Sequence, residues 1–126
     1  MKGEEIMPQG PRFEKLASDA KSRIKEISPA EAANEQASGA LLIDVREAAD
    51  FEKEHAAGAV HLSKGVVEMK IEQQAPDTAT EIICYCGGGS RSALVADNLQ
   101  KMGYENVRSM IGGFKAWKEA RLPIEK

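Results

Sequence analysis

Short apolar runs alternate along the chain with stretches in which apolar residues recur every three or four positions. The apolar runs predict strands, and the periodic stretches predict helices. The predicted strands cover residues 24–27, 41–46, 81–85 and 107–111, with a brief one within 55–62. The run 41–45 is interrupted only once by a polar residue, which indicates burial on both faces, as in a parallel sheet.

The periodic stretches predict helices at about 12–23, 29–38, 47–54, 66–75 and 93–102, and a last one after residue 113. Ser28, Pro29 and Glu31 are typical of the N-cap, first and third positions of a helix. Gly39 is expected to end that helix. Trp117, in the last helix, is expected to cover the sheet.

Because strands and helices alternate, the fold is predicted to be α/β, with an open, mostly parallel five-stranded sheet and helices on both faces. The helix within 12–23 is additional to this unit. We therefore expect an N-terminal tail and helix at 1–23 and a single domain at 24–126. Residues 1–11, with two prolines and two glycines, are expected to be a mobile tail.

Composition narrows the classes of partner. A length of 126 residues suits one domain. The net charge of −3, with both signs mixed, argues against nucleic acid or anionic lipid as the main partner. No apolar run is long enough to span a membrane, and the N-terminus lacks the apolar core of a signal peptide. With two cysteines that are poorly spaced to pair, we expect a reducing, cytoplasmic location.

The strongest chemical signal is Cys86, which stands between a predicted strand and a glycine triplet that leads into a helix. Glycines allow backbone conformations and close approaches that a Cβ prevents, so their amides can converge. A thiolate facing these amides and the positive end of the helix is stabilised, which predicts a nucleophile. Cys84, inside the apolar strand, is predicted to be a buried core residue.

Asp44 and Arg46 come at the carboxyl end of a predicted strand, the edge where open α/β sheets build their sites. We expect them to pair with each other or with the backbone and to support the loops from the second shell. His55 and His61 match no metal-binding pattern, so no metal site is predicted. Both are expected to be hydrogen-bonded loop or strand residues.

Five motifs together resemble a single-domain rhodanese over about residues 24 to 124. In chain order they are Asp44-Val45-Arg46, the stretch 55–59, the stretch 85–92, Gly103-Tyr104, and Gly112-Gly113-Phe114 with Trp117. The resemblance implies a sulfurtransferase with no metal or organic cofactor. Sulfur would pass from thiosulfate or a persulfide to a thiol or cyanide acceptor, with a protein as another possible acceptor.

By this resemblance Cys86 carries the sulfur as a persulfide, which is covalent catalysis in two steps. Main-chain amides of the following loop would hold the transferred sulfur; the loop comprises Gly87, Gly88, Gly89, Ser90 and Arg91. The family's loop often has Arg or Lys directly after the cysteine. The neutral Gly87 and Gly88 therefore predict weak use of thiosulfate.

Two other functions remain open for this sequence. The first is a phosphatase or arsenate reductase that uses a related loop. Cys86 and Arg91 enclose four residues, whereas phosphoryl-binding loops enclose five, and the shorter loop suits a single sulfur atom better. The second is a domain without catalytic activity that binds a partner or senses redox state. The presence of Cys86 favours the sulfurtransferase over this alternative.

Overall fold

The computed structural model describes residues 10–126. The predicted mobile tail therefore lies mostly outside the described residues. Its last residue, Pro11, instead begins helix α1 (Pro11–Lys21). Proline is well tolerated at this first helical position because its missing N–H would have no intrahelical partner there.

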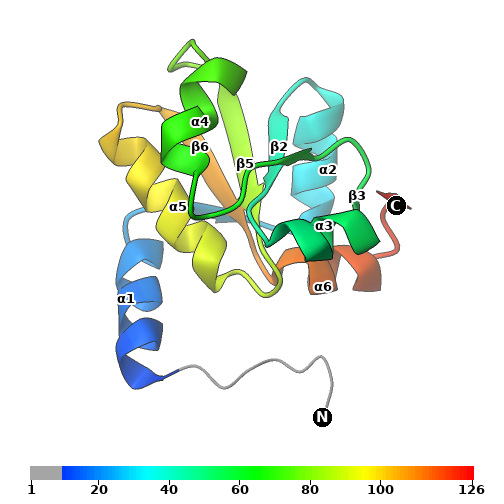
Figure 1. The fold of residues 1–126 in the computed structure, drawn as a ribbon, viewed down its shortest axis with the longest axis horizontal. Coiled ribbons are helices and arrows are strands. Elements are labelled where there is room, and N and C mark those ends of the chain that lie inside the picture. Colours follow the sequence, from blue (N-terminus) through cyan, green and yellow to red (C-terminus); the bar gives the residue numbers. More distant parts are fainter. Residues whose placement is uncertain (1–9) are drawn as a thin grey trace.

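A five-stranded sheet forms the centre of the domain, with the strand order β1-β6-β5-β2-β4. Each neighbouring pair runs parallel, so the predicted, mostly parallel sheet is confirmed. The strands are β1 (Lys25–Ile27), β2 (Leu41–Asp44), β4 (Val60–His61), β5 (Glu81–Tyr85) and β6 (Asn106–Met110). The carboxyl ends of these strands lie at the lower edge of the sheet in Figure 1.

Helices cover both faces of the sheet, as predicted (Figure 1). On one face, α4 (Val67–Gln74) and α5 (Ser90–Lys101) pack on Ile43, Ile82 and Val107. On the other, α2 (Pro29–Ala37) and α6 (Gly113–Glu119) pack on Leu42 and Ile83. A short helix, α3 (Ala48–Lys53), follows β2.

The predicted start and end of α2 are confirmed. The Ser28 hydroxyl accepts a hydrogen bond from the amide of Glu31 at 3.1 Å, and the Glu31 carboxylate accepts one from the amide of Ser28 at 2.9 Å. Gly39 follows the helix with a φ of +113°, a conformation that favours glycine. The reciprocal hydrogen bonds between Ser28 and Glu31 satisfy two amides that the helix leaves without partners.

Helix α1 packs on α5, the helix that follows the candidate nucleophile. Arg23 donates hydrogen bonds to both carboxylate oxygens of Asp97, at 3.1 and 2.8 Å. Asp97 lies on α5 and is buried. Bidentate pairs of this kind fix orientation as well as adding energy, so the ion pair sets how α1 lies on the domain.

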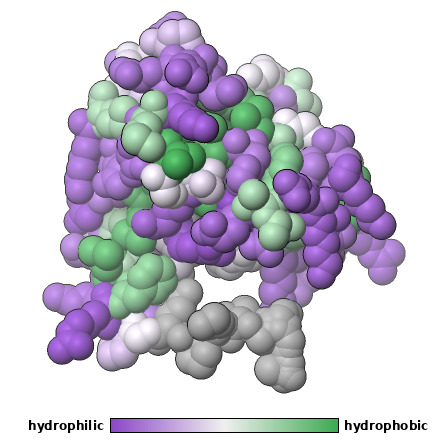
Figure 2. Space-filling model, in the orientation of Figure 1, coloured by the Kyte–Doolittle hydropathy of each residue, from purple (hydrophilic) through white to green (hydrophobic). Residues whose placement is uncertain are grey.

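A small two-stranded sheet was not predicted. In it, β3 (His55–Ala56) pairs antiparallel with β7 (Ile124–Glu125) near the C-terminus. Trp117 is buried against the sheet, as expected, and donates a hydrogen bond to the carbonyl of Pro123 at 2.8 Å. Hydrophilic residues cover most of the face in Figure 2, with apolar ones in small groups. Among residues 10–126, no helix is long and apolar enough to cross a bilayer.

Candidate active site

Cys86 lies where β5 ends and the loop to α5 begins, at the carboxyl edge of the sheet. Its Sγ accepts hydrogen bonds from the amide of Gly89 at 3.1 Å and from the amide of Ser92 at 3.4 Å. The N-cap residue of α5 is Gly89, which has no side chain to act as a cap. The sulfur therefore takes the place of a capping oxygen, where the helix dipole and the two amides favour a thiolate.

The glycine triplet has one member that needs to be glycine for backbone reasons. Gly89 has a φ of +108°, and a Cβ there would lie 3.3 Å from the amide nitrogen of Gly112. By contrast, Gly87 and Gly88 have no positive φ, and a Cβ at Gly88 would meet nothing within 4 Å. Of the three glycines, Gly89 therefore carries the backbone requirement expected of the triplet, and a side chain at Gly88 would extend into open space.

The first turn of α6 donates two main-chain hydrogen bonds to the loop. The amide of Phe114 donates to the carbonyl of Cys86 at 2.7 Å, and that of Lys115 donates to the carbonyl of Gly87 at 3.3 Å. In a planar trans peptide, the C=O and N–H groups point in opposite directions. Because α6 holds these two carbonyls, the amides of Gly87 and Gly88 face away from α6, where a bound anion can reach them.

Gly113 makes this contact between α6 and the loop possible. It has a φ of +59°, and a Cβ there would lie 2.4 Å from the carbonyl oxygen of Cys86 and 2.6 Å from the carbonyl carbon of Gly87. Real Cβ atoms essentially never come this close to other heavy atoms. Only glycine therefore lets the backbone of α6 lie directly against the loop.

Cys84 has the role that the sequence predicts. It lies inside β5, fully buried in the core beneath α4 and α5. Burial, together with the charge of the neighbouring Cys86, raises the pKa of Cys84 to about 12. Its thiol therefore stays protonated near neutral pH and is a poor nucleophile.

Of the remaining loop residues, Ser90 and Arg91 form the first turn of α5. The guanidinium of Arg91 folds back over the loop, because its Nη2 lies 3.7 Å from the point where a Cβ of Gly87 would stand. The five predicted loop residues and Cys86 are thus brought together at one edge of the sheet. Arg91 supplies a positive charge beside the two neutral glycines.

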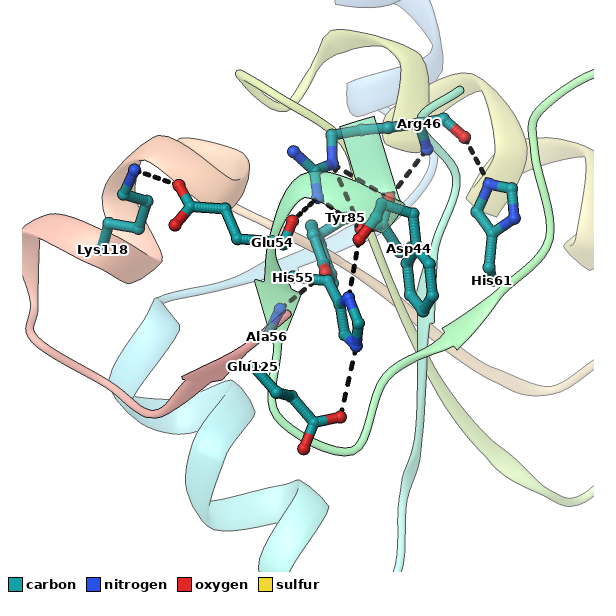
Figure 3. Close-up of polar contacts among 10 residues, drawn as sticks. Asp44, Arg46, Glu54, His55, Ala56, His61, Tyr85, Lys118 and Glu125 are labelled. Atoms are coloured by element: carbon teal, nitrogen blue, oxygen red, sulfur yellow. Dashed lines mark hydrogen bonds and ion pairs between the residues drawn. The ribbon is translucent and has the colours of Figure 1, made fainter. Parts of the chain in front are cut away.

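Asp44 and Arg46 pair with each other, as predicted (Figure 3). Arg46 is buried, and its Nη2 donates to Asp44 at 2.8 Å and to the carbonyl of Glu54 at 2.8 Å. The guanidinium lies over the ring of Phe114, 4.3 Å from its centroid. The guanidinium also lies 5.8 Å from the ring centroid of Tyr85, the residue before Cys86, so the pair supports the loop through Phe114 and Tyr85 and makes no hydrogen bond to the sulfur.

The two histidines are hydrogen-bonded, as expected. His61 Nε2 lies 2.7 Å from the carbonyl oxygen of Arg46, and His55 Nε2 lies 3.2 Å from a carboxylate oxygen of Glu125 (Figure 3). The ring of Phe51 stacks on that of His55, with centroids 3.7 Å apart. The contacts of His55 with Phe51 and Glu125 connect α3 to the small sheet.

Three further residues at the site escaped prediction from the sequence. Ser92 and Ser109 place their hydroxyls 2.8 Å apart, and the Oγ of Ser92 lies 3.6 Å from the sulfur of Cys86. Gly113 belongs to one of the five motifs, but the sequence does not show its contact with the loop. Ser109 is the next-to-last residue of β6, and no local pattern points from it to the site.

Comparison with known proteins places the chain in a family. The model of the rhodanese-like domain matches residues 28–120. The thiosulfate sulfurtransferase GlpE of Haemophilus influenzae strain PittEE is 42% identical over 103 residues, which cover 81% of this chain and 95% of that protein. The protein of the same name from Vibrio cholerae serotype O1 is 38% identical over 100 residues, covering 79% and 92%.

Solved structures share the fold of this chain. A protein from Rhodopseudomonas palustris, described as a possible tyrosine phosphatase of unknown function, is 31% identical with a TM-score of 0.80, covering 95% of this chain and all of that one. The polysulfide-sulfur transferase of Wolinella succinogenes shares the fold, with a TM-score of 0.77 at 23% identity over 90% and 87% of the two chains. The match over residues 28–120 and the close relatives establish that this chain belongs to the rhodanese family.

Proposed function

We propose that this chain is a thiosulfate sulfurtransferase that carries a sulfane sulfur as a persulfide on Cys86. The observation that supports this most directly is the position of the sulfur, which accepts two main-chain hydrogen bonds at the N-terminus of α5. Relatives that bear this name align with most of the chain. Such a setting stabilises a thiolate without a metal or organic cofactor.

In the first half-reaction the Cys86 thiolate attacks the outer sulfur of thiosulfate. A new S–S bond forms, the S–S bond of thiosulfate breaks, and sulfite leaves with its electron pair. The persulfide then carries one negative charge on its outer sulfur. The amides of Gly87 and Gly88, which α6 turns toward this space, lie where they can stabilise that charge.

In the second half-reaction an acceptor removes the outer sulfur. Cyanide gives thiocyanate, and a thiolate gives a new persulfide; in both cases the electron pair of the broken bond returns to the sulfur of Cys86. The space over Gly88 is open, because nothing lies within 4 Å of the Cβ position there. An acceptor thiol on a small molecule or on a protein can approach through this opening, and we include both in the proposal.

The guanidinium of Arg91 supports thiosulfate as a donor. The neutral Gly87 and Gly88 led to the expectation that thiosulfate is used weakly. However, Arg91 Nη2 lies beside Gly87 and brings a positive charge to the rim of the loop from α5. A cation there can hold the anionic end of thiosulfate, a role that the family often gives to residues directly after the cysteine.

Parts of the chain outside the loop contribute to the proposed function as well. Asp44 and Arg46 support α6 and the loop from the second shell. The domain at 24–126 is the catalytic unit and includes the whole family match, and the tail and helix at 1–23 are an addition to it. A cytoplasmic location is supported by the two free thiols, one of them the nucleophile. No step of the mechanism calls for nucleic acid or a membrane as partner.

Mass spectrometry of the intact protein tests the proposal. After incubation with thiosulfate and removal of the excess, we expect the mass of one added sulfur atom, and its loss with thiocyanate release when cyanide is added. Cys86→Ser should gain no sulfur, whereas Cys84→Ser should gain it as the parent does. Absence of the added sulfur in the parent, together with hydrolysis of p-nitrophenyl phosphate, would favour a phosphatase instead.

A further inference from the structure

A pair of buried hydroxyls lies beneath the nucleophile. Ser92, in the first turn of α5, and Ser109, in β6, are both fully buried, and their Oγ atoms are 2.8 Å apart. The Oγ of Ser92 lies 3.6 Å from Cys86 Sγ and 3.4 Å from the carbonyl oxygen of Gly89. A hydroxyl donates one hydrogen bond and accepts two, so Ser92 can bond to Cys86, to the Gly89 carbonyl or to Ser109, whereas the Ser109 hydroxyl bonds to Ser92.

The distances allow two arrangements that differ only in the direction of the hydrogens. With a protonated Cys86, the S–H donates to Ser92, whose own hydroxyl donates to Ser109 or to the Gly89 carbonyl. With an anionic sulfur, the hydroxyl of Ser92 turns to donate to the sulfur, and Ser109 donates to Ser92 in return. No heavy atom needs to move, and the hydroxyl pair keeps a hydrogen bond in both states.

We propose that Ser92 is a catalytic residue that donates a hydrogen bond to Cys86 Sγ as the sulfur leaves the persulfide, and that Ser109 is its positioning residue. This inference rests on the proposed function of Cys86. In the persulfide, the negative charge is on the outer sulfur and Sγ is neutral. When the acceptor takes the outer sulfur, the charge returns to Sγ.

The hydrogen bond from Ser92 therefore strengthens as the second half-reaction proceeds, which is the condition for lowering its barrier. In the first half-reaction the order is reversed, because Sγ begins as the anion and loses its charge. There the hydroxyl stabilises the anionic sulfur before the attack, and this hydrogen bond weakens as the charge leaves Sγ, so it does not lower the barrier to loading. Loss of Ser92 should slow the removal of sulfur more than its loading.

The experiment separates the half-reactions in single turnovers. Parent and variant proteins are loaded with thiosulfate, freed of the excess and mixed with cyanide, and thiocyanate is followed over time. We expect Ser92→Ala to discharge about tenfold more slowly, less than the hundredfold or more lost with an oxyanion-hole donor, because sulfur is a weak acceptor. Loading should change by no more than about threefold. During steady turnover the variant should hold more persulfide by mass.

Ser109→Ala and the double variant serve as matched controls for packing. Ser92→Ala leaves the buried hydroxyl of Ser109 without its partner and should lower the free energy of unfolding, whereas Ser109→Ala leaves Ser92 with the Gly89 carbonyl and Cys86 Sγ and should lower it less. The double change removes both hydroxyls and should recover part of the stability lost in Ser92→Ala. A catalytic role predicts that the double variant still discharges as slowly as Ser92→Ala. Discharge that recovers together with stability would overturn the inference.

Failure of this inference is distinguishable from failure of the proposed function. A parent protein that gains no sulfur would refute sulfur transfer by Cys86 itself. A parent that loads and discharges, beside a Ser92→Ala variant that discharges at the parent rate, would refute only the role of Ser92.

Discussion

Replacing Gly113 by alanine tests the contact on which the loop geometry depends. The added Cβ would lie 2.4 Å from the carbonyl oxygen of Cys86. That is roughly 1 Å short of an ordinary van der Waals separation, so the backbone of either α6 or the loop must move by about that distance. The left-handed φ of +59° also costs a residue with a Cβ about 1 kcal/mol or more.

Both effects point to losses in stability and in activity. We expect the free energy of unfolding to fall by about 2–4 kcal/mol, the range of substitutions that strain the backbone or overpack a core. A displacement of about 1 Å at a reacting group can reduce the rate by about a hundredfold. Because the hydrogen bond from Phe114 to Cys86 is at the point of contact, we expect a similar reduction in sulfur transfer.

Gly103→Ala is the matched control. Gly103 also has a positive φ, +102°, but a Cβ there would meet nothing within 4 Å, and it lies at the far end of α5. The control therefore contains the backbone strain without the clash. Urea unfolding gives the stability of both variants, and the thiosulfate to cyanide assay gives kcat/KM at a temperature where both remain folded. Equal kcat/KM in the two variants would refute the idea that Gly113 positions the loop.

Two other predictions concern charge. Arg23 holds the pKa of Asp97 below its usual range, so this pair stabilises the fold above the unfolded pKa of about 3.9, and the contribution is lost as pH falls through the lower folded value. Asp97→Asn should therefore unfold at lower urea at pH 7 and show a weaker dependence on pH below about 4. Gly88→Lys should lower the KM for thiosulfate by about fivefold, an effect that shrinks with added salt, because a rim charge is worth about 1 kcal/mol; steady-state kinetics at two ionic strengths would check it.

The elements of the fold could be predicted because local patterns specify them. The capping residues Ser28 and Glu31 lie within one turn of each other, and the apolar run of β2 is continuous in the sequence. Cys86 can be identified for the same reason, because a strand directly precedes it and the glycines and the helix directly follow it. The pairing of β3 with β7 was not, because it joins two-residue segments that lie far apart in the chain.

The parts of the site that the sequence did not reveal depend on contacts between distant segments. Ser109 reaches the nucleophile only because β6 runs parallel beside β5, in a register that sets Ser109 opposite Cys84. The closeness of Gly113 to Cys86 likewise depends on where α6 begins above the sheet. Neither residue differs in its local sequence from an ordinary strand serine or helix-initiating glycine, so composition and periodicity carry no signal for them.

The glycine triplet shows how one sequence feature can serve two purposes. Gly89 is required by its own backbone conformation and by the close approach of Gly112, whereas nothing in the backbone requires a glycine at 87 or 88. The amides of the latter two residues face away from α6, and a Cβ at Gly88 would meet nothing within 4 Å. Charged side chains at positions 87 and 88 would add charge to the loop but would leave less room for a large acceptor. Under the proposed function, the opening over Gly88, beside Arg91, is therefore where an acceptor thiol would reach the persulfide.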